Sequence, residues 1–293
     1  MTKPIETVAV CGAGGTMGAG IAIVSARAGF RTFCFDVAEA AVTRSLQQTD
    51  AFFAKTVERG RMRAEDKDAV MGRLVASTSL DDVAAADLVI EAVYEDLETK
   101  QVLLGRLNAV CPPHTIFASN TSTLSITEIA AGSGRADRVV GLHFCLPAQL
   151  MKLIEVSPGL TTSEETLKAA WEWCERAGQL PVKTQDKPGF VLNALLIPFL
   201  NDCIRAVEAG VATPADVDTA MKIGLGYKMG PMELMDLVGM DTMMRLAEAF
   251  YPVTLDPRCG APPLLRRMAA AGTLGRKSGR GFFTYDGNAM FGA

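Results

Sequence analysis

The sequence predicts an α/β fold, in which a doubly wound sheet with a projecting helix pair is followed by an all-helical C-terminal domain. Three observations predict this fold. Short apolar runs alternate with amphipathic helical segments over the first 185 residues, which is typical of a mostly parallel sheet covered on both faces. A glycine-rich turn follows the first apolar run. Beyond residue 190 the apolar spacing is helical throughout.

The length of the chain favours two domains. With 293 residues, the chain is at the upper end of what a single hydrophobic core supports. Pro188 and Gly189, in the segment TQDKPGF, interrupt both helical and strand patterns. We therefore expect one domain at 1–185 and a second domain at 186–293.

The composition excludes several classes of protein. A net charge of -4 and an isoelectric point near 5.4 argue against nucleic acid or an anionic membrane as the main partner. The 7 cysteines include no C-x-x-C pair, so we expect reduced thiols and neither a disulfide framework nor a metal site. The segment MTKPIETVAV lacks the layout of a signal peptide, and the apolar stretch FVLNALLIPFL is too short to span a bilayer. We expect a cytoplasmic protein.

The elements follow from the apolar pattern in chain order. Strands are expected at 7–11, 31–36, 87–93, 115–119, 138–144, 152–156 and 180–184. The segment 38–73 has no strand-like run and predicts a pair of long helices, broken around ERGRMRAED, that projects from the sheet. In the second domain, helices are expected at about 190–209, 214–223, 231–250 and 262–272.

The glycine-rich segment VAVCGAGGTMGAGIA predicts a dinucleotide site in a Rossmann-type domain. It has the required order of strand, glycines and helix, so that backbone amides at the helix N-terminus can meet a pyrophosphate. Asp36 ends the second expected strand, where a carboxylate suits the ribose hydroxyls of NAD and repels the extra phosphate of NADP. The residues expected to hold NAD here are Gly12, Gly14, Gly15, Thr16, Met17, Gly18 and Asp36.

The alternative for this segment is a plain glycine-rich turn, with Asp36 serving as a helix cap. The glycine spacing also departs from the usual pattern. Gly12 to Gly18 reads G-x-G-x-x-x-G, one residue longer than G-x-G-x-x-G. We expect the loop to bulge at Gly15.

One of the 2 histidines lies in an apolar strand. His143 ends the expected strand 138–144, at the sheet edge where open parallel sheets place their ligand crevice. Glu155 lies within another apolar run, KLIEV, where a carboxylate needs a partner to offset its desolvation. If the two runs pack together, Glu155 holds one imidazole nitrogen and leaves the other as a general base. The alternative is a hydrogen-bonded core histidine. His114, in CPPHTIF, is expected in an exposed turn without a functional role.

Two further polar groups stand in apolar surroundings. Ser122 belongs to the polar cluster ASNTSTLSI just after an expected strand, where Ser122 or Thr123 can also cap the following helix. Asn193 lies in the apolar segment GFVLNALLIPFL directly after the domain boundary, so its amide faces either the domain cleft or a structural partner. A serine hydrolase is disfavoured because Ser122 is not in a G-x-S-x-G elbow and His143 precedes Glu155. A His–Glu pair beside a nicotinamide site favours alcohol oxidation.

With these residues in view, the chain resembles the L-3-hydroxyacyl-CoA dehydrogenase family, in its short bacterial 3-hydroxybutyryl-CoA type. The resemblance covers nearly the whole chain. It rests on the segments GAGGTMGAGIA, DLVIEAVYEDLETKQ, ASNTSTLSITEIA, GLHF–P–MKLIEV, DKPGFVLNALL, DTAMKIGLGYKMGPMELMDLVGMDT and LGRKSGRGFFTY.

The resemblance implies roles for individual residues. His143 is the general base, Glu155 orients it, Ser122 bonds the substrate's 3-oxygen, and Asn193 helps to place substrate and base. Glu95, Lys100 and Asn120 match positions near the nicotinamide and ribose. The projecting helices contact the CoA end, with Lys55 and Arg59 as candidates for its phosphates; a solvated helix face is the alternative for those two. The helical domain forms a homodimer and closes over the acyl chain.

The chain also departs from the pattern of the family. Where the family usually has H-F-F-N-P, this chain has His143 followed by Phe, Cys145, Leu146 and Pro, so that a branched apolar side chain replaces an amide. Ala194 stands where an arginine is usual. We expect NAD-dependent oxidation of an (S)-3-hydroxyacyl-CoA, with 3-hydroxybutyryl-CoA as the first candidate, and the reverse reduction. The alternatives are a dehydrogenase of a 3-hydroxy acid without CoA and a weakly active cofactor-binding homologue.

Overall fold

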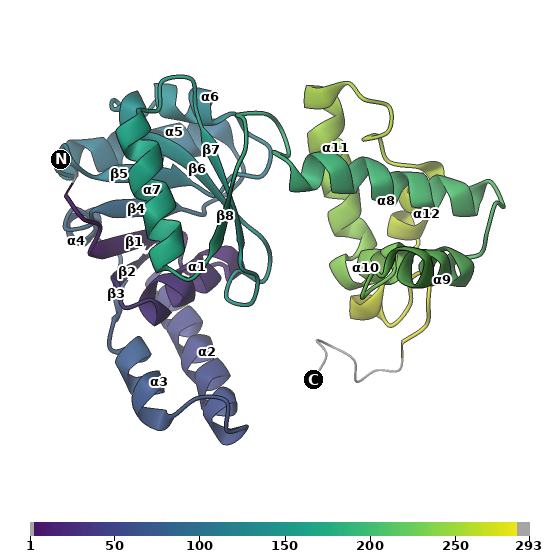
Figure 1. Cartoon of the computed structure of the whole chain (residues 1–293), viewed down its shortest axis with the longest axis horizontal. Coiled ribbons are helices and arrows are strands. Elements are labelled where there is room, and N and C mark those ends of the chain that lie inside the picture. Colours follow the sequence, from purple (N-terminus) through teal and green to yellow (C-terminus); the bar gives the residue numbers. More distant parts are fainter. Residues whose placement is uncertain (1–2, 286–293) are drawn as a thin grey trace. The chain divides into compact units, whose positions relative to one another are not determined.

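The computed structural model describes residues 3–285. These residues form two compact units, which divide between Phe190 and Val191. The first unit is the α/β domain that the sequence predicts, and the second is helical (Figure 1). The division falls five residues beyond the boundary expected at 185. No helix within residues 3–285 is long and apolar enough to cross a membrane.

The first unit is built on an eight-stranded sheet in the order β3-β2-β1-β4-β5-β6-β7-β8. All neighbouring strands are parallel except β6 and β7, which pair antiparallel. The strands are β1 Thr7–Cys11, β2 Arg31–Phe35, β3 Leu74–Ser77, β4 Leu88–Glu91, β5 Ile116–Ser119, β6 Val139–Phe144, β7 Leu153–Pro158 and β8 Leu180–Lys183. Seven of them match the expected strands to within two residues at each end, and β3 was not predicted.

Helices cover both faces of the sheet, as doubly wound folds require. Successive residues of β1 point to opposite faces: Val8 joins the core under α1 and α7, and Ala9 joins the core under α5 and α6. The helices of this unit are α1 Thr16–Arg27, α2 Glu39–Glu58, α3 Ala64–Met71, α4 Leu80–Val83, α5 Leu97–Val110, α6 Ile126–Ala131 and α7 Glu164–Arg176, with a 3-10 turn η1 at Ala136–Arg138.

The helices α2 and α3 extend away from the sheet as a pair (Figure 1). Their own apolar cluster, which includes Phe53 and Val70, packs against Ile23 of α1. The pair predicted for 38–73 is therefore present. However, only α2 is long, because α3 ends at Met71 after eight residues and the chain enters the edge strand β3.

The second unit contains five α-helices among the described residues. They are α8 Leu192–Glu208, α9 Pro214–Leu225, α10 Pro231–Val238, α11 Met240–Thr254 and α12 Pro263–Ala270, followed by the 3-10 turn η2 at Arg276–Ser278. The single helix predicted at 231–250 was wrong. Gly239 divides it with a φ of 97°, a conformation that ends a right-handed helix. Buried Met232, Met235 and Met243 pack around this break and form the core of the unit.

Candidate active site

The glycine loop between β1 and α1 has a backbone that excludes side chains. Gly12 has a φ of 86°, and a Cβ there would lie 2.6 Å from the carbonyl oxygen of Ala92. A Cβ on Gly18, in the first turns of α1, would lie 2.2 Å from the carbonyl oxygen of Gly12. The helix and loop therefore approach each other as closely as a pyrophosphate cradle needs.

The additional residue of the loop lies in the turn before the helix. Gly15 donates its N–H to the carbonyl oxygen of Gly12 at 3.0 Å and forms the N-cap of α1 with extended backbone angles. Within residues 3–285 no side chain caps this helix, so the amides of Thr16 and Met17 begin a twelve-residue helix whose positive end faces the loop. These features fit a bound pyrophosphate.

Asp36 follows β2 directly and lies against the same loop. Its Oδ2 accepts the N–H of Gly14 at 3.1 Å, and its Oδ1 accepts the N–H of Ala38 at 3.3 Å. An ionised carboxylate has about four acceptor positions, so further positions remain for ribose hydroxyls. Asp36 is not a helix cap, since α2 has Ala38 at its N-cap and no side-chain cap hydrogen bond. The carboxylate instead orders the turn before α2 and lies beside the glycine loop.

His143 and Glu155 are directly opposite each other on the antiparallel strands β6 and β7. This register places both side chains on one face of the sheet. His143 Nδ1 lies 2.8 Å from Glu155 Oε2, and the two side chains are 7% and 1% exposed. A hydrogen bond from Nδ1 to this carboxylate fixes the imidazole so that its other nitrogen, Nε2, can act as a base.

The free edge of the imidazole meets the loop that follows β5. Ser122 Oγ lies 3.3 Å from His143 Nε2, so the hydroxyl and the imidazole are within hydrogen-bonding distance. Ser122 is not the helix cap considered from the sequence. Helix α6 is capped by Ser125, whose Oγ accepts the N–H of Glu128, and Asp186 accepts the N–H of Ile126.

Asn120 belongs to this loop, Glu95 bonds its backbone, and Lys100 lies beneath it. Asn120 Oδ1 accepts the N–H of Phe144 at 2.9 Å, which ties the loop to the residue after His143. Glu95 Oε1 accepts the backbone N–H of Ser122 at 2.7 Å. Lys100 is only 1% exposed and forms an ion pair with Glu91 beneath the loop.

The environment of the site changes the acidity of two side chains. Burial alone would raise the pKa of Glu95, but the Lys100 ammonium and hydrogen bonds from the loop lower it below its ordinary value. Burial, together with the charge of Glu155, raises the pKa of the Cys145 thiol to about 11. Glu95 is therefore an ionised acceptor, and Cys145 remains a neutral thiol at physiological pH.

The comparisons with known proteins agree with this geometry. Residues 7–187 match the family model for the NAD binding domain of 3-hydroxyacyl-CoA dehydrogenase, and residues 189–285 match the model for its C-terminal domain. The chain belongs to the 3-hydroxyacyl-CoA dehydrogenase family. It is 42% identical to the 3-hydroxybutyryl-CoA dehydrogenase of Mycobacterium tuberculosis, with 97% of this chain and 100% of that protein covered.

Two other relatives show how the family varies in substrate. The crystal structure of (S)-3-hydroxybutyryl-CoA dehydrogenase from Ralstonia eutropha is 37% identical, has a TM-score of 0.90, and is matched over 96% of this chain and 99% of that chain. The 3-hydroxyadipyl-CoA dehydrogenase of Escherichia coli is 40% identical over 96% of this chain, which covers 59% of that longer protein. As a 3-hydroxyacyl-CoA dehydrogenase, this chain is an oxidoreductase with an NAD-binding domain.

Three residues of this dehydrogenase site were not singled out from the sequence. Phe190 packs on the imidazole of His143 with ring centroids 5.5 Å apart and has a φ of 50°, which is unusual for a bulky residue. Asp186 anchors α6, and Glu91 pairs with Lys100. The segment TQDKPGF was interpreted only as a breaker, although its position before an apolar helix was visible in the sequence.

The remaining predicted substrate residues lie at the periphery or in the second unit. Lys55 is on the exposed side of α2, and Arg59 follows the last residue of that helix. Asn193 is the second residue of α8 and is half-buried. The contacts of these three residues with a substrate stay predictions.

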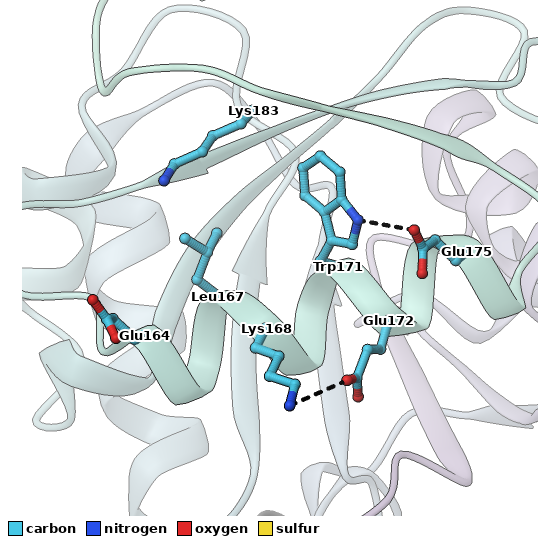
Figure 2. A pocket seen from close by; sticks show the side chains of 7 residues that line it. All are labelled: Glu164, Leu167, Lys168, Trp171, Glu172, Glu175 and Lys183. Carbon is cyan, nitrogen blue, oxygen red and sulfur yellow. Dashed lines mark hydrogen bonds and ion pairs between the residues drawn. The ribbon is translucent and has the colours of Figure 1, made fainter.

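A separate hollow lies on the outer side of α7 and contains none of the predicted site residues. Figure 2 shows Trp171 donating its ring N–H to Glu175, with Lys168 beside Glu172 and Lys183 of β8 across from them. The ion pair of Lys168 with Glu172 is exposed, so it contributes little to stability. Among residues 3–285, no group of three or more His, Cys, Asp or Glu side chains is arranged to hold a metal ion.

Proposed function

We propose that this chain interconverts an (S)-3-hydroxyacyl-CoA and the corresponding 3-oxoacyl-CoA with NAD, and that 3-hydroxybutyryl-CoA is its principal substrate. The single observation that carries the proposal is the position of His143, between Glu155 at 2.8 Å and Ser122 at 3.3 Å. A base supported by a buried carboxylate, beside a hydroxyl that can bind an alcohol oxygen, suits the oxidation of a secondary alcohol. The named relatives support the choice of acyl group.

In the oxidation, His143 Nε2 accepts the proton of the substrate's 3-hydroxyl. NAD, held by Gly12, Gly14 and Asp36, would supply the acceptor for the hydride from carbon 3 of the substrate. Glu155 accepts the N–H of Nδ1, which fixes the tautomer whose lone pair is on Nε2 and stabilises the imidazolium that forms on proton transfer. In the reverse direction, the imidazolium returns the proton to the 3-oxygen.

Ser122 places the substrate oxygen at the base. Its hydroxyl donates to the 3-oxygen, and the separation of 3.3 Å from Nε2 leaves both groups within reach of one bound oxygen. Phe190 covers one side of the imidazole and reduces its contact with water. Asn193 contributes an amide to substrate placement from the start of α8.

Binding of the CoA moiety requires positively charged side chains and an extended protein surface. Lys55 and Arg59, on the exposed side and at the end of α2, are proposed to meet its phosphates. The second unit is proposed to form a homodimer, and the cytoplasm is the proposed location. The seven free cysteines support a reducing compartment.

The test is the oxidation of NADH by the full-length chain with acetoacetyl-CoA and longer 3-oxoacyl-CoA compounds. Acetoacetyl-CoA should be reduced, whereas free acetoacetate should not. His143→Ala should lower kcat by about 10²-fold or more because the 3-oxygen then has no proton donor in the reduction. Its matched control is His114→Ala, since the other histidine bonds to Asp87 and not to the site.

Four results would each contradict a part of the proposal. Robust turnover by His143→Ala would contradict the role of His143 as the general base. Faster reduction of free 3-oxo acids than of their CoA thioesters would favour the dehydrogenase without CoA. Binding of NADH without turnover of any acyl chain length would favour the weakly active homologue. A higher rate with the six-carbon dicarboxylyl thioester would instead place the chain with its 3-hydroxyadipyl-CoA relative.

A further inference from the structure

The last turn of the first unit lies against the imidazole of His143. This turn, residues 185–190, follows β8, and Phe190 is the last residue before the division between the units. The phenyl ring of Phe190 packs on the imidazole, with ring centroids 5.5 Å apart and ring planes inclined by 41°. Phe190 is buried and belongs to the apolar core under α5 and α6. Its ring therefore contacts both that core and the base.

The imidazole is restrained by two different contacts. Its Nδ1 lies 2.8 Å from Glu155 Oε2, and this hydrogen bond fixes one edge of the ring. A hydrogen bond at one nitrogen does not fix the plane of the ring, which can still turn about the bond. The contact with the Phe190 ring restricts that rotation, because aromatic pairs have preferred orientations. The direction of Nε2 toward Ser122 therefore depends on Phe190 as well as on Glu155.

The backbone of Phe190 has a disfavoured conformation. Its φ is 50° and that of the preceding Gly189 is 79°, so two consecutive residues are in the left-handed region. Glycine adopts this region readily, but a bulky residue with a Cβ does not. Residues in such conformations persist where the surrounding structure fixes them, and they are concentrated at functional sites. The turn must therefore be anchored by other contacts.

Asp186 anchors the turn to the start of α6. Its Oδ1 accepts the N–H of Ile126 at 2.7 Å, and its Oδ2 accepts the N–H of Thr127 at 2.8 Å. The hydroxyls of Ser125 and Thr127 donate to the same Oδ2 at 2.9 Å and 2.5 Å. Hydrogen bonds to a carboxylate are about twice as strong as those between neutral groups. Four such bonds therefore hold the start of the turn on this helix.

The rest of the turn is fixed by backbone hydrogen bonds. The N–H of Phe190 donates to the carbonyl oxygen of Lys187 at 3.0 Å, which closes the turn. The N–H of Gly189 donates to the carbonyl oxygen of Ser122 at 3.2 Å. The turn is thus attached to α6 through Asp186 and to the loop after β5 through Gly189, and its last residue contacts the base.

Capping of α6 does not by itself account for Asp186. Ser125 is already the N-cap of this helix, and its Oγ accepts the N–H of Glu128. The helix has only six residues, and the carboxylate that reaches it comes from 60 positions beyond Ile126 in the chain. What Asp186 adds to the cap is a connection between α6 and the turn that carries Phe190.

We propose that Phe190 and Asp186 are positioning residues of the dehydrogenase. Phe190 fixes the plane of the His143 imidazole, and Asp186 fixes Phe190 by holding the turn 185–190 on the start of α6. The effect of Asp186 on the rate therefore passes through Phe190. This role rests on the proposed function of His143 as the general base.

The first measurement is kcat with acetoacetyl-CoA and NADH for Phe190→Leu and Asp186→Asn in the full-length chain. Phe190→Leu keeps an apolar side chain and removes the ring. Asp186→Asn removes one of the two acceptor oxygens. Each variant should lower kcat by roughly 10-fold to 100-fold, since a small displacement of an aligned group has effects of that size. A kcat within about twofold of the wild-type value in either variant would overturn the proposal.

The second measurement observes the imidazole directly by NMR, without substrate. The chain has 2 histidines, so protein labelled with ¹³C at histidine gives one ring Cε1–H signal from each, which His114→Ala assigns. The ring current of Phe190 acts on the signal of His143. Phe190→Leu should displace this signal, and Asp186→Asn should displace it as well, with the His114 signal unchanged. A His143 signal that keeps its wild-type position in Asp186→Asn would overturn the proposal.

The double variant tests whether the two residues act through one contact. If Asp186 acts through Phe190, then Asp186→Asn combined with Phe190→Leu should have a kcat within about threefold of that of Phe190→Leu alone. The two changes then remove the same restraint on the imidazole. Losses that multiply would overturn the proposal.

The matched control for Phe190→Leu is Phe30→Leu. Phe30 is also a buried phenylalanine in an aromatic pair, with its ring centroid 6.1 Å from that of Trp173. It directly precedes β2, at the ends of the parallel strands opposite the site. Phe30→Leu should lower the free energy of unfolding and leave both kcat and the His143 signal unchanged. Equal losses of kcat in Phe30→Leu and Phe190→Leu would make the effect nonspecific and overturn the positioning role.

The matched control for Asp186→Asn is Ser125→Ala. It removes the cap of α6 and one of the four donors to Asp186, so that three donors still hold the turn. It should lower stability and leave the His143 signal at its wild-type position. A His143 signal displaced equally in Ser125→Ala and Asp186→Asn would show that the stability of α6, and not the anchor, controls the base, and would overturn the proposal.

Two further variants give the same tests where the first ones do not fold. Phe190→Met removes the ring and keeps a flexible apolar side chain. Asp186→Glu keeps the carboxylate and lengthens the side chain, which displaces the turn from α6. Either variant with the kcat and the His143 signal of the wild type would overturn the proposal. An inactive wild type would overturn the proposed function and the positioning role together, whereas an active wild type with fully active variants would overturn only the latter.

Discussion

His143 and Glu155 face each other across the antiparallel pair β6 and β7, with Nδ1 and Oε2 2.8 Å apart. The residues are twelve positions apart in the chain, and the hairpin between the strands brings them into register. A shift of the pairing by one residue would turn one of the two side chains to the other face of the sheet. The catalytic proposal therefore depends on this register as much as on the identity of the two residues.

Replacement of Glu155 tests the electrostatic part of this relationship. Glu155→Gln keeps the size of the side chain and removes the negative charge that stabilises the imidazolium. We expect kcat with acetoacetyl-CoA and NADH to fall by about 10²-fold to 10³-fold, with a smaller change in the KM for NADH. Steady-state kinetics over both substrates would measure the two effects separately.

The control for this change is Glu175→Gln on α7. Glu175 accepts the ring N–H of Trp171 at 3.0 Å on the outer face of that helix. Its replacement should leave kcat within about twofold of the wild-type value, as is usual for surface changes. A Glu155→Gln variant that retains a third or more of the wild-type kcat would contradict the role of the carboxylate.

Ser122 and Ser125 allow a comparison of two serines three residues apart. Ser122→Ala removes the hydroxyl beside His143 and should lower kcat/KM for acetoacetyl-CoA by roughly 10-fold to 100-fold. Ser125→Ala removes the cap of α6 and should lower the free energy of unfolding by about 1 kcal/mol without changing kcat. The measurements are steady-state kinetics and urea unfolding of both variants.

The reverse pattern would contradict the assignment of these serines. If Ser125→Ala lost activity and Ser122→Ala lost only stability, then the loop would be structural and the base would have no hydroxyl partner from the protein. Equal losses of activity in both variants would indicate that α6 as a whole controls the site.

The sequence predicted the sheet well because its signals are local. Buried strands such as β4 and β6 are continuous apolar runs, and the glycine loop has a fixed order of elements. β3 was missed for a physical reason. It has four residues and lies at the edge of the sheet, and its apolar run of three residues, Leu74–Ala76, is too short to be distinguished from the helical segment before it.

The parts that could not be predicted depend on contacts between distant residues. From the sequence, a contact between His143 and Glu155 was expected only if the two apolar runs packed together. The antiparallel pairing of β6 and β7 that brings this about is not encoded in either strand alone. Lys100 was assigned to the cofactor from the resemblance, and that assignment stays a prediction. Its ion pair with Glu91 could not be predicted, because it depends on how α5 packs over β4. The break at Gly239 was missed because helical spacing continues through it.

Asp36 should determine the choice between NAD and NADP. Asp36→Ala removes the carboxylate that bonds Gly14 and stands at the end of β2. We expect the Kd of NADH to rise by roughly tenfold, and the preference for NADH over NADPH to fall, because the repulsion of a 2′-phosphate is lost. Fluorescence titration with both cofactors measures this. Asp50→Ala on α2 is the control, and an unchanged preference in Asp36→Ala would contradict the assignment.

Asp87 should make the free energy of unfolding depend on pH in the acidic range. Burial alone would raise the pKa of Asp87, but Lys3 and the N–H groups of Glu6 and Thr7 lower it below its ordinary value. Since the pKa is lower in the folded state than in the unfolded state, ionised Asp87 stabilises the fold above the unfolded pKa of about 4. This contribution is lost as the pH falls below that value, through the folded pKa.

The variant Asp87→Asn tests the direction of this pH dependence. At pH 7 the variant should have a free energy of unfolding lower by about 1–3 kcal/mol, since the buried acceptors lose their charge. The difference from the wild type should shrink as the pH is lowered below about 4, because protonation then removes the same charge from the wild type. Urea unfolding at several pH values measures it, with Asp68→Asn on the exposed side of α3 as the control. A difference that stays constant or grows on acidification would show that the charge of Asp87 does not stabilise the fold.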